Sequence, residues 1–192
     1  AKSAIKHGHK LISASASEGT LGRQHLLELL DLVEQSDFIY ILETNGMTLG
    51  HDKSYSKALA RYKNLHVRVS LKGCNEEEFH KVTGARCDAY RLPFKAMENL
   101  MEAGVSCNAC VNTSFSDDAS IAQVKEDLAK VAPGILKSLE IEWITMFPKV
   151  AERLAKHDLT PTKYKRLPRY GRSRKNGVSG RSSNKSRSKT AA

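Results

Sequence analysis

The pattern of apolar and polar positions divides the chain into strand-like and helix-like segments that alternate. Segments that are apolar throughout, or at every second residue, predict five strands, at residues 9–16, 37–43, 65–71, 105–112 and 139–145. Segments with apolar residues three or four apart predict helices at residues 22–35, 53–62, 88–103, 116–131 and 148–156, with a short helix after Asn75 and the end of another at 4–8. The segment 37–43 is nearly all apolar or aromatic, as expected for a strand covered on both faces.

Strands that alternate with helices predict an α/β fold with parallel strands and right-handed crossovers. A doubly wound sheet and a partial (β/α) barrel both fit this order, and composition does not separate them. In either fold the loops that follow the strands lie at one edge of the sheet, where α/β proteins bind their ligands. The residues at the strand ends are therefore the first candidates for a functional site.

Polar side chains follow several of the predicted strands. The first strand runs into a turn of small residues that contains Glu18. The second is followed by Thr44 and Asn45, and Ser70 and Lys72 stand at the end of the third. Polar residues gathered at strand ends suit a polar ligand. An ordinary interpretation stays open for each turn, because Ser, Asn and Gly are common turn residues and a lysine there is often simply solvated.

The four cysteines form neither a disulfide scaffold nor a complete metal motif. Cys74 and Cys87 stand apart, and only Cys107 and Cys110 are closely spaced. No second pair of Cys or His residues stands at the distance of a zinc site. Both closely spaced cysteines fall inside a predicted strand, where residues i and i+3 point to opposite faces. We expect two partly buried structural thiols there and assign no metal ligand.

The positive charge of the chain is concentrated at its end. The formal net charge is +10, yet residues 160–192 hold 11 of the 31 Lys and Arg and none of the 21 Asp and Glu. This Ser- and Gly-rich segment lacks the apolar content to fold alone, so we divide the chain into a domain at 1–159 and a disordered basic tail at 160–192. The tail suits either a solvated role or weak, salt-sensitive contact with nucleic-acid phosphates.

The chain shows no sign of membrane insertion or export. No apolar run approaches the roughly 20 residues that a membrane span needs, and the N-terminus has no apolar core of a signal peptide. We therefore expect no membrane partner and, from the cysteine usage, a place in the cytoplasm.

Several segments, in a fixed order along the chain, resemble motifs of the radical SAM superfamily. The turn S-A-S-E-G-T-L-G at 15–22 is similar to the S-G-G-E-P-T-x-G turn of that family. The segments L-E-T-N-G at 42–46 and V-R-V-S-L-K-G at 67–73 look like its third and fourth strand ends. The segments at 77–85 and 141–148 resemble relatives of pyruvate formate-lyase activating enzymes. Together the resemblance covers about residues 4–158.

The resemblance implies an incomplete (β/α)6 barrel of the TIM type that binds S-adenosylmethionine (SAM) at a 4Fe–4S cluster. Reductive cleavage of SAM would then start radical chemistry on a small-molecule, peptide or RNA substrate, with a reductant such as ferredoxin or flavodoxin as partner. The cofactor-binding residues that it implies are Ala16, Ser17, Glu18, Asn45, Ser70 and Lys72.

Each implied residue has a role in the resemblance. The backbone of Ala16 and Ser17 and the carboxylate of Glu18 would meet the amino group of SAM, because a carboxylate and an ammonium form a strong, charge-assisted hydrogen bond. Ser70 and Lys72 would hold the ribose or the carboxylate of SAM. The ribose or a substrate would face Asn45.

Two departures from the family pattern qualify the resemblance. Ala16 and Ser17 replace two glycines, and their Cβ atoms narrow the approach of the turn to a ligand. The cluster motif C-x3-C-x2-C is absent and would be expected upstream of residue 4. The leading hypothesis is a radical SAM protein whose cluster segment is missing from this chain. The alternatives are a non-enzymatic descendant without a cluster and a nucleic-acid-associated protein that acts through its basic tail.

Overall fold

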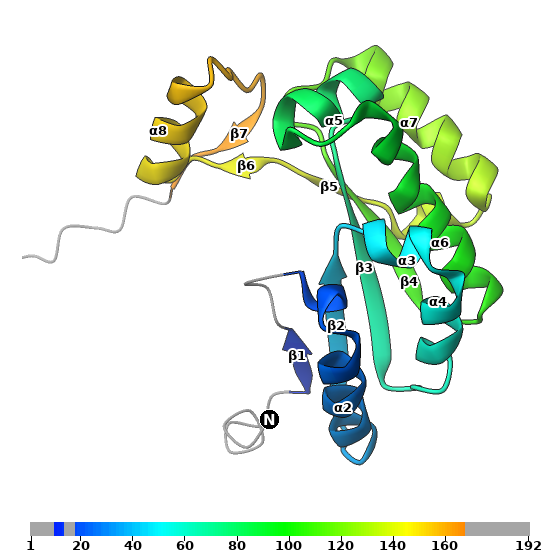
Figure 1. Ribbon diagram of the computed structural model, residues 1–192. Helices are drawn as coiled ribbons and strands as arrows, with labels where there is room; N and C mark the ends of the chain where they lie inside the picture. The colour runs from blue at the N-terminus through cyan, green and yellow to red at the C-terminus, as the bar shows by residue number, and fades with distance from the viewer. Residues whose placement is uncertain (1–9, 14–17, 168–192) are drawn as a thin grey trace, which may run out of the picture.

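Five parallel strands form one curled sheet. The computed structural model describes residues 10–13 and 18–167. The strands are β1 (Leu11–Ser13), β2 (Ile39–Thr44), β3 (Leu65–Lys72), β4 (Cys107–Asn112) and β5 (Glu140–Glu142), and they pair in chain order. In Figure 1 the connecting helices lie on one side of the sheet and leave the other side open. Strands in chain order, curling with helices outside, form an incomplete TIM-like half-barrel, which confirms the predicted fold and excludes the doubly wound alternative.

The helices follow the predicted order. They are α2 (Arg23–Glu34), α3 (Met47–His51), α4 (Lys53–Leu59), α5 (Glu76–Thr83), α6 (Leu92–Glu102), α7 (Asp118–Val131) and α8 (Pro148–Lys156), with 3-10 turns η1 (Gly19–Leu21), η2 (Cys87–Arg91) and η3 (Ile135–Ser138). Two predicted helices differ. The helix expected at 53–62 is preceded by α3, and the one expected at 88–103 divides into η2 and α6 with Pro93 in its first turn. The helix end expected at 4–8 lies outside the described residues. None of the described helices is long and apolar enough to cross a membrane.

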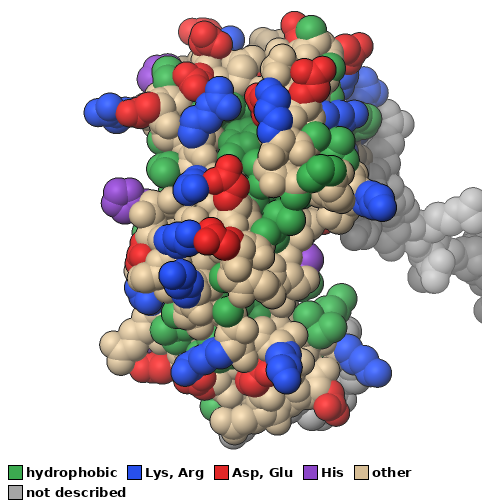
Figure 2. Space-filling model, turned by 90° about the vertical axis from the view of Figure 1, so that its right-hand side faces the viewer, with side chains coloured by type: hydrophobic (Ala, Val, Ile, Leu, Met, Phe, Trp, Pro, Cys, Tyr) green, Lys and Arg blue, Asp and Glu red, His purple; other side chains and the backbone are tan. Residues whose placement is uncertain are grey.

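The hydrophobic core lies between the sheet and the helices. Alternate residues of β3 and β4, such as Val67, Val69 and Val111, are buried against helix residues such as Leu30 and Met97. Burial of one such side chain contributes about 1.5–3 kcal/mol, so this layer supplies most of the driving force for folding. On the outer surface of the helices, acidic and basic side chains are interspersed (Figure 2), in line with the near balance of charges in residues 1–159.

The opposite, concave face of the sheet is polar and only partly covered. The alternate residues that face it are His66, Arg68, Ser70 and Lys72 of β3, Asn108, Cys110 and Asn112 of β4, and Glu140 and Glu142 of β5. The expectation that 37–43 is covered on both faces is wrong, because Ile39 is 43% exposed on the concave side. Among the described residues, helices cover one face of the sheet.

The last predicted strand divides in two. Residues 140–142 stay in the main sheet as β5, whereas β6 (Ile144–Thr145) pairs in parallel with β7 (Tyr164–Lys165). Ser114 directs this change, since its hydroxyl accepts a hydrogen bond from the Ile144 N–H (2.7 Å) and its carbonyl accepts one from the Thr162 N–H (2.7 Å). Figure 1 shows β6, α8 and β7 as a small unit beside the sheet. Residues 160–167, assigned to the tail from sequence, thus include a short strand, and 168–192 lie outside the described residues.

Candidate functional site

The carboxylate of Glu18 joins the first turn to the end of β2. Its Oε1 accepts hydrogen bonds from the Thr20 hydroxyl (2.7 Å), the Thr20 N–H (3.3 Å) and the Thr44 hydroxyl (2.7 Å), and its Oε2 accepts one from the Asn45 N–H (2.7 Å). The Glu18 side chain also caps η1. Within the described residues Oε2 has one donor, so it keeps capacity to accept another hydrogen bond. Glu18 therefore has a positioning role whether or not a ligand is present.

Asn45 and Gly46 form the turn that starts α3. The Asn45 Oδ1 accepts a hydrogen bond from the Met47 N–H (2.9 Å), and the Gly46 N–H donates to the Thr44 hydroxyl (3.1 Å). Gly46 has φ +76°, and a Cβ there would lie 2.9 Å from Val69 Cγ1, so the turn requires glycine. The ordinary turn role of Asn45 is therefore present. Its Nδ2 makes no hydrogen bond within the described part of the chain, which leaves a donor for a ligand.

Ser70 and Lys72 lie on the concave face near the carboxyl end of β3. Parallel pairing places Ser70 beside Cys110 and Lys72 beside Asn112. Both side chains are half-buried, and neither forms a hydrogen bond or an ion pair with any described residue. The charge of Lys72 helps to lower the pKa of the Glu142 carboxyl. The two side chains are thus oriented by the strand yet retain their hydrogen-bonding capacity.

Arg68 forms the centre of a charged cluster two residues before Ser70. Its guanidinium donates to Glu140 Oε2 from Nε (3.1 Å) and Nη2 (2.9 Å), and also from Nη2 to Glu142 and to the Cys110 sulfur. The carboxylate of Glu43 lies 3.8 Å away. The Arg68 side chain is only 13% exposed, so the three carboxylates compensate a largely buried charge.

The titration of this cluster follows from its contacts. Hydrogen bonds from Arg68 lower the pKa of Glu140 and outweigh partial burial. Burial acts to raise the pKa of Glu142, but hydrogen bonds from Arg68 and Cys110 and the nearby positive charges leave it lowered. The hydrogen bond to Glu140 raises the pKa of Arg68 further above its usual range. Burial and then the charge of Glu142 raise the pKa of Cys110 to about 12, so its thiol stays protonated at neutral pH.

A hydrogen-bonded chain continues this network toward the amino ends of the strands. The His66 Nδ1 lies 2.8 Å from the Ser106 hydroxyl, and its Nε2 lies 2.9 Å from Asn108 Oδ1. The Asn108 amide group donates to Glu140 Oε1 (2.7 Å), which leaves Oδ1 as the acceptor. Neutral His66 therefore carries its proton on Nε2 and accepts from Ser106 at Nδ1. The side chain of His66 thus links Ser106 to Asn108 in this polar chain.

The described cysteines do not fit an iron–sulfur cluster. Cys107 packs against the hydrophobic core, while Cys110 contacts Arg68 on the concave face, which confirms that the two point to opposite faces of β4. Burial raises the pKa of Cys107 and of Cys74 to about 11, so neither thiol is predisposed to ligate a metal. The ligand atoms of Cys110, Glu140 and Glu142 lie within 4.8 Å of one another, but the guanidinium of Arg68 already bonds to all three. A cation would have to displace it.

The structure brings some of the predicted residues together. Glu18 and Asn45 meet at the end of β2, and Ser70 and Lys72 lie along the end of the adjacent β3. Ala16 and Ser17 lie outside the described residues. Sequence reasoning missed the Arg68 cluster, although the alternation in L-H-V-R-V-S-L-K places Arg68 on the same face as Ser70 and Lys72.

Comparison with solved structures finds the same fold in proteins that bind S-adenosylmethionine. SuiB from Streptococcus suis bound to S-adenosylmethionine gives a TM-score of 0.59 at 14% identity, over 86% of this chain and 39% of SuiB. The native anSMEcpe with bound AdoMet gives a TM-score of 0.55 at 18% identity, over 69% of this chain and 37% of that protein. SuiB bound to its precursor peptide SuiA gives 0.56 at 14% identity, over 86% of this chain and 39% of that one.

These similarities concern the fold, since the identities are low. The chain spans about two-fifths of the length of SuiB and anSMEcpe, with 39% and 37% covered. No family model matches the sequence, and no curated protein matches it either. The resemblance to pyruvate formate-lyase activating enzymes stays a prediction.

Proposed function

We propose that this chain supplies the SAM-binding part of a radical SAM protein. The observation that carries this proposal is the polar concave face at the carboxyl edge of a half-barrel whose fold is that of proteins with bound SAM. Ligands of α/β barrels bind at that edge, where loops and strand ends supply the contacts. The bound cofactor would supply an alkyl radical when it is reduced at an iron–sulfur cluster. Because the described cysteines do not fit such a cluster, we derive no step through it.

The residues of the chain suit different parts of SAM. The remaining acceptor capacity of Glu18 Oε2 suits the ammonium group, and the ammonium of Lys72 suits the carboxylate. The hydroxyl of Ser70 and the free amide donor of Asn45 suit the ribose or an acceptor on the substrate. The backbone of Ala16 and Ser17 is proposed to contact the amino group of SAM as well. These groups would bind and orient the cofactor.

Isothermal titration with SAM tests the assignment. We expect Lys72→Met to weaken SAM binding by about ten- to a hundredfold, because a hydrogen bond to a charged group contributes about 1.5–3 kcal/mol. Lys57→Met removes the same charge from α4, which lies on the helix-covered side, and should leave the affinity unchanged. Equal affinities of the Lys72 variant and the wild type would contradict the role of Lys72.

The Glu18 variant needs a conservative form. From sequence alone, Glu18→Ala would be expected to leave the fold intact. The carboxylate accepts four hydrogen bonds, however, and the two from Thr44 and Asn45 join the turn to the end of β2. Glu18→Gln keeps an acceptor at this place while it removes the charge. A weakened titration with an unchanged melting temperature would support direct contact with the ammonium, whereas equal affinity would limit Glu18 to positioning.

We further propose a peptide as the substrate class. SuiB has been seen with its precursor peptide SuiA, and anSMEcpe with a Kp18Cys peptide, and both share this fold. Of the three classes that the sequence left open, a peptide therefore has support from the comparisons. A reductant such as ferredoxin or flavodoxin stays a prediction.

A further inference from the structure

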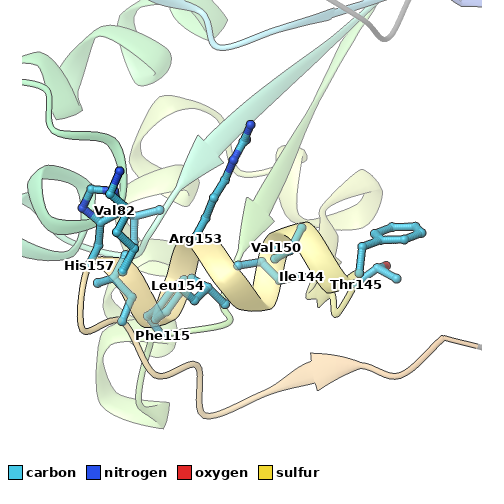
Figure 3. Close-up of a pocket in the computed structure, with 11 residues that line it drawn as sticks. Val82, Phe115, Ile144, Thr145, Val150, Arg153, Leu154 and His157 are labelled. Atoms are coloured by element: carbon cyan, nitrogen blue, oxygen red, sulfur yellow. The ribbon is translucent and has the colours of Figure 1, made fainter.

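An apolar groove of about 700 Å³ runs between α8 and the body of the protein. Its α8 side is formed by Val150 and Leu154, and its other side by Val82 of α5, Phe115 of the loop after β4, and Ile144 of β6. Figure 3 shows these side chains along α8, with Arg153 extending from the helix beyond the apolar residues. A volume of this size accommodates several side chains of a binding partner.

The apolar face of α8 is not fully covered by the described chain. None of the nine residues of α8 is buried, and Val150 and Leu154 are only half-buried. Close by in the sequence, Trp143 is 44% and Phe147 is 51% exposed. An amphipathic helix normally buries its apolar stripe, and a large apolar surface left in contact with solvent marks an interaction site.

The groove is lined by basic side chains and by no acidic ones. Arg153, Lys156 and His157 line it, and no carboxylate does. All three are exposed, and Arg153 and Lys156 form no ion pair with a described residue. A purely apolar partner would remove these cations from water without compensation, which is unfavourable. A second copy packed symmetrically would bring the same cations face to face, which is also unfavourable.

We propose that this groove binds an acidic amphipathic peptide, whose apolar side chains enter the groove and whose carboxylates pair with Arg153 and Lys156. The groove lies beyond the carboxyl ends of β3, β4 and β5, since Val82, Phe115 and Ile144 follow those strands. That is the same edge of the sheet as Glu18, Asn45 and Lys72. The peptide is thus placed to continue toward the concave face as the substrate or its recognition segment, a step that rests on the proposed function.

Selection from a displayed library of random 12-residue peptides tests the groove on the full chain, without SAM. The selected peptides should combine Leu, Ile or Phe with Asp or Glu. A synthetic copy of the leading peptide, labelled with fluorescein, is then measured by fluorescence anisotropy. We expect its affinity to fall at least tenfold when its Glu and Asp become Gln and Asn, and also in the Arg153→Glu, Lys156→Glu double variant.

The matched control is Lys149→Glu, because Lys149 is on the same helix, carries the same charge and does not line the groove. It should retain the affinity, and circular dichroism should show that all variants keep the wild-type fold. Leu154→Ser should weaken the binding of the acidic peptide and the binding of its Gln and Asn form by the same factor.

Several results would overturn the proposal. One is that no peptide is enriched, and another is that the selected peptides lack acidic residues. A third is that the Arg153→Glu, Lys156→Glu double variant binds the peptide as tightly as the wild type. A molar mass that rises with concentration and falls in Leu154→Ser would assign the groove to a second copy instead. Stronger binding to phosphatidylglycerol vesicles than to any peptide would assign it to a lipid surface. SAM is absent from these measurements. A negative peptide result would therefore not contradict SAM binding, and a negative SAM titration would not contradict peptide binding in the groove.

Discussion

The Gly50→Ala variant is expected to lose about 3 kcal/mol of unfolding free energy, or to fail to fold. Gly50 lies in α3, and a Cβ built there would overlap the carbonyl oxygen of Leu92, at the start of α6, and would come 2.9 Å from its carbonyl carbon. Backbone atoms cannot rotate away from such a contact, so the two helices would have to separate. Overpacking of this kind costs about 1–3 kcal/mol and sometimes more.

Thermal unfolding measures this effect. A loss of about 3 kcal/mol corresponds to a fall of roughly 10 °C in Tm for a domain of this size. The sign is informative, because Ala in place of Gly within a solvent-exposed helix would instead stabilise by up to about 1 kcal/mol. The control is Gly134→Ala, where φ is −79° and nothing lies within 4 Å of the added Cβ. An unchanged Tm for Gly50→Ala would contradict the packing of α3 on α6.

The same substitution links packing to the candidate site. The turn formed by Asn45 and Gly46 leads directly into α3, and the N–H of Asn45 donates to Glu18. A displaced α3 would pull this turn away from the Glu18 carboxylate. Any folded fraction of the Gly50 variant should therefore bind SAM more weakly, although no atom of Gly50 belongs to the proposed site.

The elements that depend on local patterns were predictable from the sequence. The helix at 148–156 and the cap of α5 by Asn75 follow from spacing and from side-chain chemistry within a few residues. The sequence predicted one strand at 139–145, but it could not show that this segment divides into β5 and β6. Its division depends on Ser114, and the Trp143 indole donates to Thr113 (3.1 Å), so both causes lie some 30 residues away along the chain.

In the candidate site, too, the residues could be predicted from local sequence but their contacts could not. The four residues Glu18, Asn45, Ser70 and Lys72 could be named because each follows or ends a strand. The contact of Glu18 with Thr44 spans 26 residues, and the contacts of Arg68 with Glu140 and Glu142 span 72 and 74. Such pairs depend on the register of parallel strands, which one sequence does not reveal.

Replacing Arg68 by Met is expected to destabilise the protein at neutral pH by about 2 kcal/mol. Removing one partner of a fully buried ion pair costs about 3–5 kcal/mol, and the carboxylates here are partly exposed, which screens the effect. The Arg68 side chain is 13% exposed, while the side chains of Glu140 and Glu142 are 49% and 38% exposed. Without the cation, two close carboxylates and the nearby Glu43 repel one another.

The dependence of stability on pH separates this cause from a simple loss of packing. In the wild type the pKa values of Glu140 and Glu142 lie below the ordinary value of about 4.5. Their contribution is therefore complete above pH 4.5 and is lost as the pH falls through the lowered folded pKa values. In Arg68→Met the repulsion between the carboxylates raises the folded-state pKa values of Glu140 and Glu142 above 4.5. These two residues then destabilise the folded state at neutral pH, and this destabilisation should disappear as the pH falls toward 4.5. Urea unfolding from pH 7 to pH 3 should show the deficit of the variant shrinking.

A charge-matched surface variant provides the comparison. Arg86→Met removes an arginine that pairs with Asp88 in solvent, with side chains 86% and 67% exposed. Exposed pairs contribute little, so this variant should follow the wild-type curve closely over the whole pH range. A deficit of Arg68→Met that stays constant from pH 7 to pH 3 would assign its effect to lost packing. In that case the conclusion that the ion pairs of Arg68 with Glu140 and Glu142 stabilise the fold would be wrong.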